Sequence, residues 1–270
     1  MILEIRIGSR MWFVSKHRVV DLMTELDGVI AVWKRELLVF RREISRVVAS
    51  IASPLMWLLL FGSGLSASVN VGETGYQKFI FPGIVIMSVL FSSVFYGLYI
   101  VWDRKIDVLK AVLVAPVSRI AIFFGKVLGG STDSLIQSTI LIVIGLFFVA
   151  YTPLGMILTL LTVLLTAIGF VALGLTIGSM FESFEGFQLI STFLVFPLFF
   201  LSGALFPLDK NLPGWLMTVS KFDPVTYAVD AARSAILGQS AFPIYFDLGV
   251  LTVFAVVMVF IGSIAFSRMK

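Results

Sequence analysis

Long apolar runs without a charged side chain most constrain what this chain can fold into. A helix that crosses a bilayer needs about 20 predominantly apolar residues. Five runs of 20 or more residues contain no Asp, Glu, Lys or Arg, at 47–72, 79–102, 134–181, 186–208 and 248–267. The run at 134–181 has 48 residues with Tyr151-Thr152-Pro153 in its middle, enough for two helices and a turn. The sequence therefore predicts an all-α membrane protein with six transmembrane helices, at about 47–69, 79–102, 130–150, 154–180, 187–207 and 246–267.

The overall composition agrees with a chain surrounded by lipid. Apolar residues make up 59% of the sequence, against about 45–50% in an ordinary soluble domain. A soluble protein would have to build its own exterior from this apolar surface. We therefore expect residues 47–270 to form a single transmembrane domain, preceded by an N-terminal segment, 1–46.

The distribution of basic residues predicts the orientation of the six helices. If the N-terminus is inside, sixteen Lys and Arg residues fall on the inner side and four, Lys78, Lys210, Lys221 and Arg233, on the outer side. Cytoplasmic loops carry such an excess of positive charge. We expect a multi-pass protein of the plasma membrane with both termini in the cytoplasm. The basic pI then reflects topology, and we expect no nucleic acid as a partner.

The N-terminal segment has its own pattern. It holds nine Lys or Arg residues and no apolar core before a small-residue cleavage site, so it is not a cleaved signal peptide. Between Leu22 and Arg46, apolar residues recur every three or four positions while Lys34, Arg35 and Arg41 lie on the other side. A basic amphipathic helix before a first span usually lies along the inner membrane surface. It serves either as an orientation anchor alone or also as a contact for a cytoplasmic partner.

Residues that carry chemistry are few. Cysteine is absent, His17 is the only histidine, and no GxxxxGK[ST] phosphate-binding loop occurs. We therefore expect no catalytic residues, no metal site and no enzyme activity; if the chain is a pump, its energy comes from another subunit. Asp133, near the start of the third predicted span, is either an ion-coupling group or an interfacial residue facing protein or headgroups. Glu182 and Glu185 form a weak metal site, a solvated turn or a partner contact.

Two segments go beyond generic membrane sequence. The inner loop 103–119 places Ile106, Leu109, Val112 and Leu113 on one face of a short helix that ends at Pro116. It is either a lever that a cytoplasmic protein pushes or a plain link between spans. The outer segment 200–233 is too rich in polar residues and proline to span. It fits two re-entrant half-helices, near 213–219 and 225–237, or an ordinary outer loop with a surface helix.

Together these segments resemble the permease subunits of type-2 ABC exporters over nearly the whole chain. The inner loop matches that family at Asp103, Arg104, Leu113, Pro116, Ser118 and Arg119, while Asp107 stands where glycine is common. The outer pattern SGxxFPL, LPxWL and DPxTYxxDxxR is the more specific match. Residues 54–58 and 61–64 look most like the daunorubicin-resistance and related drug-export branch.

The resemblance implies a homodimer of this chain, paired with two separate ABC ATP-binding subunits, which would bind ATP and magnesium. The residues it implies for coupling to those subunits are Asp103, Arg104, Ile106, Leu109, Val112, Leu113, Pro116, Ser118 and Arg119. The residues of the outer re-entrant element are Gly203, Phe206, Pro207, Pro213, Trp215, Pro224, Tyr227, Asp230 and Arg233. ATP-driven closure of the partner subunits would press on the inner loop and swing the spans.

The expected function is the transmembrane half of an ATP-driven exporter with a hydrophobic drug-like or lipid-like cargo. Phenylalanine is abundant, at 26 residues, and Met56, Met87, Met156 and Met180 lie in the spans, although packing against lipid explains such residues equally well. Small residues at 62–64, and at Gly174 and Gly178, suit close helix packing. The alternatives are the same machine with a polysaccharide, glycolipid or sodium cargo, an integral membrane enzyme, or a self-sufficient channel or secondary transporter.

Overall fold

The computed structural model describes residues 2–7, 10–65, 75–106, 117–208 and 213–269. Among these residues, six helical segments are long and apolar enough to cross a membrane, at Val47–Gly64, Tyr76–Lys105, Arg119–Gly145, Pro153–Met180, Phe184–Leu201 and Ile244–Ser267. The prediction of an all-α membrane domain with six spans is confirmed. In chain order the elements are β1 (Ile2–Ile7), β2 (Arg10–Ser15), α1 (Lys16–Arg42), α2 (Ile44–Gly64), α3 (Tyr76–Phe95), α4 (Leu98–Lys105), α6 (Arg119–Gly145), α7 (Pro153–Met180), α8 (Phe184–Leu201), α9 (Gly214–Ser220), α10 (Pro224–Leu237) and α11 (Ile244–Ser267).

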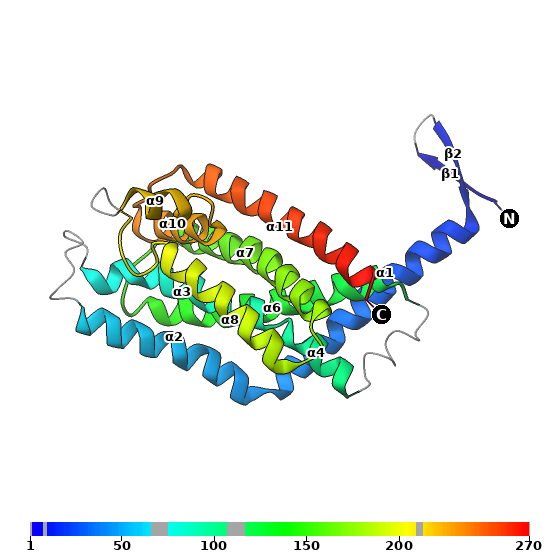
Figure 1. Cartoon of the computed structure of the whole chain (residues 1–270). Helices are drawn as coiled ribbons and strands as arrows, with labels where there is room; N and C mark the ends of the chain where they lie inside the picture. Colours follow the sequence, from blue (N-terminus) through cyan, green and yellow to red (C-terminus); the bar gives the residue numbers. More distant parts are fainter. Residues whose placement is uncertain (1, 8–9, 66–74, 107–116, 209–212, 270) are drawn as a thin grey trace.

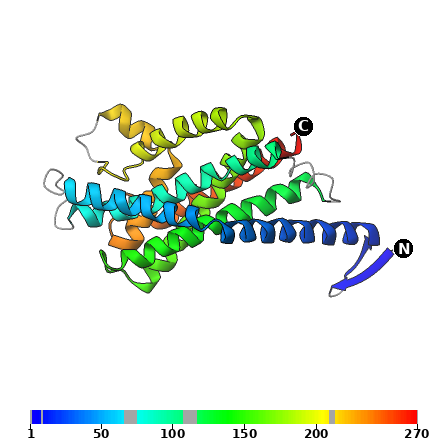
Figure 2. The same ribbon diagram turned by 90° about the horizontal axis from the view of Figure 1, so that it is seen from below.

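The spanning helices run along one common direction, with the short helices α9 and α10 gathered at one end (Figure 1). The C-terminus, the end of α4 and the start of α6 lie at the opposite end, next to α1. Figure 2 shows α1 continuing away from the bundle toward the N-terminus. We call the end near the two termini the inner end and the end with α9 and α10 the outer end, following the orientation expected from the basic residues.

An antiparallel hairpin precedes α1, which the sequence patterns did not predict. Strands β1 and β2 pair with Ile2 opposite Ser15 and Ile7 opposite Arg10. The amphipathic helix expected from Leu22 to Arg46 is present as α1, which begins earlier, at Lys16, and ends at Arg42. One face of α1 packs along α6, where the indole nitrogen of Trp33 donates to the Thr132 hydroxyl at 3.1 Å.

Burial divides the spans into a core and a periphery. Within its most apolar window, the α3–α4 span is 72% buried, whereas α2 and α11 are each 17% buried and α8 is 22% buried. The spans α3–α4, α6 (56% buried) and α7 (50% buried) therefore form the centre of the bundle, while α2, α8 and α11 expose most of their apolar surface. In a membrane such surface contacts lipid or another protein chain.

Close glycine contacts hold α7 against the junction of α3 and α4. A Cβ atom on Gly97 would lie 1.9 Å from the carbonyl oxygen of Gly174, and one on Gly174 would lie 2.3 Å from the carbonyl oxygen of Val94. Gly178 faces the backbone of Gly97 in the same way, at 2.3 Å. The GxxxG spacing at Gly174 and Gly178 thus serves a backbone-to-backbone contact inside one chain.

The third span differs from its predicted bounds. It was expected to begin near residue 130, but α6 begins at Arg119 and ends at Gly145, and the Ser118 hydroxyl caps it by accepting from the Ala121 amide. Counting charge-free residues excluded its first turns because they contain Arg119, Lys126 and Asp133. The Lys126 side chain is 1% exposed and is neutralised by carboxylates on other helices, so it belongs inside the bundle.

The segment between α8 and α11 folds into two short helices, as expected. Helix α10 runs from Pro224 to Leu237, and Asp223 caps its start. Gly238 follows its last residue with a φ of 68°, a backbone conformation that favours glycine. It packs against α3, α7 and α11, and most of its side chains are buried. Helix α9 begins after Pro213 and is more exposed.

A candidate cargo cavity and its charged inner end

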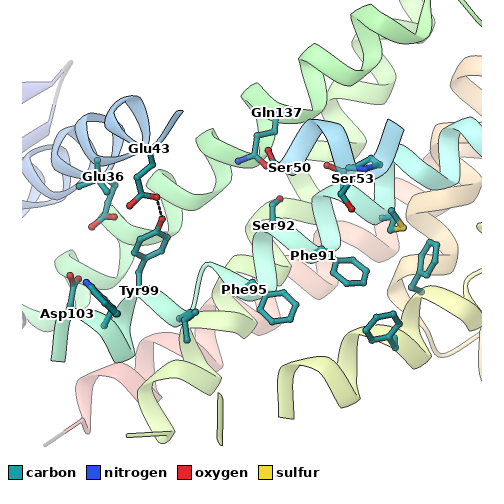
Figure 3. A pocket seen from close by; sticks show the side chains of 18 of the residues that line it. Glu36, Glu43, Ser50, Ser53, Phe91, Ser92, Phe95, Tyr99, Asp103 and Gln137 are labelled. Carbon is teal, nitrogen blue, oxygen red and sulfur yellow. Dashed lines mark hydrogen bonds between the residues drawn. The ribbon is translucent and has the colours of Figure 1, made fainter. Parts of the chain in front are cut away.

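A cavity of about 860 Å³ lies among α1, α2, α3, α4, α6 and α8. Figure 3 shows side chains of these helices turned toward this space, with carboxylates at one side and phenyl rings at the other. Its lining comprises Arg35, Glu36, Val39, Glu43, Ser50, Ser53, Pro54, Trp57, Met87, Ser88, Phe91, Ser92, Phe95, Leu98, Tyr99, Trp102, Asp103, Ile106, Gln137, Phe196 and Phe199. A cavity of this size, with mostly apolar walls and a few polar groups, is typical of small-molecule sites.

The chemistry of the lining changes along the direction of the helices. The innermost residues include Arg35 and Glu36 of α1, Asp103 of α4, and Glu43 between α1 and α2. The outermost come from α2, α3 and α8 and include Trp57, Met87, Phe91, Phe196 and Phe199. Among the aromatic rings, Phe91 meets Phe196 edge-on at 5.4 Å and Trp57 stacks on Phe61 at 4.8 Å between ring centroids. The cavity thus offers a charged inner end and an aromatic outer end.

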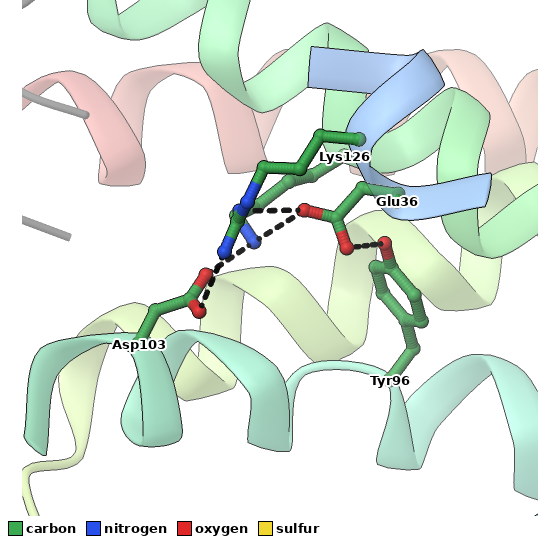
Figure 4. A network of polar contacts seen from close by, with 5 residues as sticks. Glu36, Tyr96, Asp103 and Lys126 are labelled. Atoms are coloured by element: carbon green, nitrogen blue, oxygen red, sulfur yellow. Dashed lines mark hydrogen bonds and ion pairs between the residues drawn. The ribbon is translucent and has the colours of Figure 1, made fainter. Parts of the chain in front are cut away.

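Lys126 is the centre of the charged inner end (Figure 4). Its ammonium group lies 2.7 Å from an oxygen of Asp103 and 3.1 Å from an oxygen of Glu36. Arg35 joins both carboxylates, at 3.1 Å from Asp103 and 3.0 Å from Glu36. Two cations therefore face two anions contributed by α1, α4 and α6. A buried charge is tolerated when paired and hydrogen-bonded in this way.

Two tyrosines extend this arrangement along α3 and α4. The Tyr96 hydroxyl donates to Glu36 at 2.8 Å, and the Tyr99 hydroxyl donates to Glu43. Burial lowers the pKa of Arg35, but the hydrogen bond and charge of Asp103 together with Glu36 outweigh that effect and leave the pKa above its ordinary value. Arg35 therefore stays protonated at physiological pH. Helix α1 is thus attached to the bundle by side-chain bonds over about two turns.

The predicted coupling residues that the structure describes tie helix ends together. Asp103 is 5% exposed and turned into the ion-pair network, so its carboxylate is occupied within the chain. Arg104 donates to the carbonyl oxygens of Phe181 and Ser179 at the end of α7, at 3.1 and 3.2 Å. Arg119 donates to carbonyl oxygens at the end of α11, those of Ser267 and Met269. A positive charge at a helix C-terminus stabilises the helix, so both arginines stabilise the helix ends that they contact.

Ser118 links the start of α6 to α1. Its amide lies 3.2 Å from a carboxylate oxygen of Glu25, and its hydroxyl also bonds to that carboxylate. Ile106, at the end of α4, is 50% exposed. Leu109, Val112, Leu113 and Pro116 lie outside the described residues. The two ends of the inner loop are thus both attached to α1, one through Asp103 and one through Ser118.

The outer predicted residues form a second cluster. The Asp230 carboxylate accepts from the amides of Ala241 and Phe242, at 2.8–3.0 Å. The Arg233 guanidinium donates to the Gly203 carbonyl at 2.9 Å and stacks 4.1 Å over the Phe79 ring. Burial lowers the pKa of Arg233 to about 10, against an opposing effect of Asp230. It remains charged at neutral pH.

The other outer residues have varied positions. The Tyr227 hydroxyl donates to the Lys221 carbonyl at 2.6 Å, which closes the turn between α9 and α10. Pro207 lines a smaller cavity of about 320 Å³ that also includes Asp230 and Arg233. Pro213 and Pro224 begin α9 and α10. Phe206 and Trp215 are 44% and 65% exposed and do not join the cluster.

Sequence reasoning missed three residues that the structure places at the cavity or its inner end: Glu36, Lys126 and Gln137. Glu36 and Lys126 are charged residues in helical segments, and a charge of each sign near the inner ends of two helices was the available signal. Gln137 carried no signal in a single sequence. Asp133 is 3% exposed and lies well inside α6 rather than near its start. In the described part of the chain, no group of three or more His, Cys, Asp or Glu side chains is placed to hold a metal ion.

Comparison with known proteins agrees with this architecture. The pattern that describes the family "ABC-2 type transporter" matches residues 28–237. The Inner membrane transport permease YadH of Escherichia coli (strain K12) is 30% identical over 234 residues, covering 84% of this chain and 89% of that protein. Nodulation protein J of Rhizobium meliloti (strain 1021) is 28% identical over 88% of this chain and 92% of its own length. The Putative transport permease ycf38 of Cyanophora paradoxa is 26% identical over 87% and 86% respectively.

Proposed function

This chain belongs to the ABC-2 type transporter family, and we propose that it is the membrane-spanning subunit of an exporter that moves a hydrophobic, drug-like or lipid-like amphiphile out of the cell. As a permease of this family it has no ATPase domain and works with separate ATP-binding subunits. Its Escherichia coli relative is named an inner membrane transport permease, which supports placing this chain in the inner, or plasma, membrane as a multi-pass protein. The likeness of residues 54–64 to the daunorubicin-resistance branch belongs to the same proposal.

The observation that carries the proposed cargo class is the gradient along the cavity. An amphiphile in the inner leaflet has its polar end toward the cytoplasm and its apolar body toward the membrane centre. The cavity has the same order, with Arg35, Glu36 and Asp103 at its inner end and Trp57 and Phe199 farther out. Aromatic rings bind apolar and ring-containing bodies without demanding one shape.

The proposed coupling runs through the loop between α4 and α6, at residues 106–118. Its proximal end is held to α1 by Asp103 and Arg35, and its distal end by Ser118 and Glu25. Arg104 and Arg119 attach the same two ends to α7 and α11. A push on the loop by an ATP-binding subunit would therefore reach several helix ends at once, as expected of a rigid lever.

We further propose a homodimer in which α2 and α8 of each copy face the other. Both helices line the cavity and both are largely exposed, with Met56 at 54% and Phe193 at 78%. A second copy placed there would complete the cavity wall. Both termini lie at the end that carries the basic loop, which supports a cytoplasmic location for each.

The test is the ATPase activity of the chain in lipid, alone and co-purified with a P-loop protein encoded beside it. The proposal predicts no activity for the chain alone and a stable, ATP-hydrolysing complex with that partner. Leu109→Asp with Leu113→Asp should abolish hydrolysis stimulated by the permease, since the sequence predicts that both residues lie on the apolar face of the inner loop. Phe222→Asp is the matched control, because Phe222 is 84% exposed at the outer end. A chain that moves solute in liposomes without any ATPase would instead indicate a channel or secondary transporter.

A further inference from the structure

Gln137 lies in the middle of α6 at the wall of the cavity. Its contacts do not explain why a polar side chain is buried there. Its side chain is 1% exposed. Neither its amide nitrogen nor its amide oxygen has a hydrogen-bond partner among the described residues. Figure 3 shows the side chain between α6 and the serines of α2.

Two serines near Gln137 on α6, Ser134 and Ser138, are hydrogen-bonded and help to fix its position. The Ser134 hydroxyl, about one turn earlier, lies 2.9 Å from the Ser92 hydroxyl and 3.0 Å from the Ser93 hydroxyl of α3. The Ser138 hydroxyl donates to the Ser134 carbonyl at 2.7 Å. These bonds set the register of α6 against α3, so the Gln137 amide is held at one place along the cavity.

An amide left in this state is costly to the fold. A buried polar group without a partner destabilises a protein, and more so in surroundings without water. The same group is already desolvated and fixed, so a ligand that bonds to it gains the interaction without a new ordering cost. A primary amide both donates and accepts, which suits a ligand group that also does both.

We propose that Gln137 is the residue that selects the polar group of the cargo, which is a neutral amide carried on an aromatic or alicyclic body. This inference rests on the proposed function of the cavity. Phe91 and Phe95 of α3 lie on the same stretch of the cavity wall as Gln137 and offer faces for the ring. The ligand amide then completes the two hydrogen-bonding positions of Gln137.

The distribution of charge favours a neutral group at this depth. The charged lining residues Arg35, Glu36, Glu43 and Asp103 all come from the inner end. Around Gln137 the polar lining consists of hydroxyls, those of Ser50, Ser53, Ser88 and Ser92. A charged ligand group would be stabilised at the inner end, whereas an uncharged amide meets its complement at Gln137.

The test compares the binding of two amide probes, one with N–H donors and one whose N–H hydrogens are replaced by methyl groups. Tritiated 2-naphthamide donates and accepts, and its N,N-dimethyl derivative only accepts. Binding is measured by scintillation proximity on the full chain in nanodiscs, with empty nanodiscs subtracted. We expect naphthamide to bind the wild type about tenfold more tightly than the derivative, and Gln137→Met to remove that preference, since one to two buried hydrogen bonds have that size.

Gln188→Met on α8 is the matched control, because Gln188 is exposed and lies outside the cavity. It should leave the preference unchanged. The melting temperature gives a second readout: Gln137→Met should keep it or raise it, because the variant removes an unsatisfied buried group. A melting temperature that falls while the preference stays would show a structural amide and overturn the inference.

Failure of this inference is distinguishable from failure of the cavity assignment. If wild type and Gln137→Met bind both probes equally, and Phe91→Ala weakens both, the cavity binds ring-containing molecules but Gln137 does not select the amide. If Phe91→Ala leaves the binding of both probes unchanged, the probes bind outside the cavity, which overturns the inference together with the proposed cargo cavity. The ATPase measurement on the complex tests the transporter assignment independently of both.

Discussion

Both ends of the bundle have charged side chains bonded to backbone groups, but among the described residues only the inner end also has salt bridges between helices. At the inner end, Lys126, Asp103, Glu36 and Arg35 pair side chain to side chain across three helices. At the outer end, the charged side chains of α10 instead bond to backbone groups, as Asp230 does with two amides. The backbone partners are part of turns that the fold already requires, whereas the ion pairs depend on how α1, α4 and α6 lie relative to one another.

This difference indicates which end of the molecule can change shape. When helices shift slightly as rigid bodies, a charged side chain that pairs with another helix can change its partner. The partners that it keeps limit the free-energy cost of that change. A carboxylate that closes a turn of its own segment moves with that segment. We therefore expect the inner end to respond to a partner subunit and the outer end to move as one piece.

The largest expected effect comes from removing the shared cation of the inner end. Lys126→Met should lower the free energy of unfolding by about 3–5 kcal/mol, because Glu36 and Asp103 would keep Arg35 alone as a cation. The measurement is thermal unfolding in detergent, followed by size-exclusion chromatography. Lys78→Met, at an exposed outer position, should change the melting temperature little. Equal effects of the two variants would mean that the inner network does not stabilise the bundle.

A smaller loss is expected at the close glycine contact between α7 and the junction of α3 and α4. Gly174→Ala places a methyl group 2.3 Å from the carbonyl oxygen of Val94, so α7 must separate from α3. Such overpacking costs about 1–3 kcal/mol. Gly249→Ala on α11 is the control, because a Cβ there meets no atom within 4 Å. The same thermal unfolding assay should separate the two variants.

At the outer end, Asp230→Asn should cost about 1–2 kcal/mol, less than Lys126→Met. The asparagine oxygen can still accept from one backbone amide, but the charge and the second acceptor are lost. Hydrogen exchange of the Ala241 and Phe242 amides measures the effect directly, and both should exchange faster. Asp27→Asn on the exposed side of α1 should leave those amides unchanged. An outer variant more damaging than Lys126→Met would reverse the comparison between the two ends.

The last expected effect is a change in pH dependence. Burial raises the pKa of Asp223 to about 7, although its bond to the Val225 amide opposes this. The ordinary aspartate pKa is about 3.9, so between about pH 4 and 7 the folded chain binds a proton that the unfolded chain releases. Stability should therefore fall as pH rises through that window and be flat above it. Asp223→Asn should reduce the slope of melting temperature against pH, and an unchanged slope would rule out this contribution.

Much of the fold follows from local sequence, and the errors occur where distant residues neutralise each other. Charge-free runs located all six spans, and the proline and glycine positions located α9 and α10. The start of α6 was wrong because Lys126 pairs with Glu36, 90 residues away, and with Asp103, 23 residues away. No local pattern records such a pairing.

The candidate site was predictable only in part. The spacing of Tyr227, Asp230 and Arg233 placed them on one helix, yet their partners Gly203 and Ala241 come from other segments. Arg104 and Arg119 were identified through a family pattern that does not reveal the helix ends they contact. The cavity needs six helices to form, so the role of Gln137 in its wall has no counterpart in the sequence near it.

The most direct test of the account measures distances at both ends of the chain in its complex with the ATP-binding subunit. The chain has no cysteine, so spin labels can be placed at chosen exposed positions: Leu26 and Met180 at the inner end, and Phe147 and Tyr245 at the outer end. Electron spin resonance compares the nucleotide-free complex with one trapped by ATP and vanadate, using labelled chains diluted with unlabelled ones. The account predicts that the inner distance changes while the outer distance stays the same. A constant inner distance with a changing outer distance would contradict it.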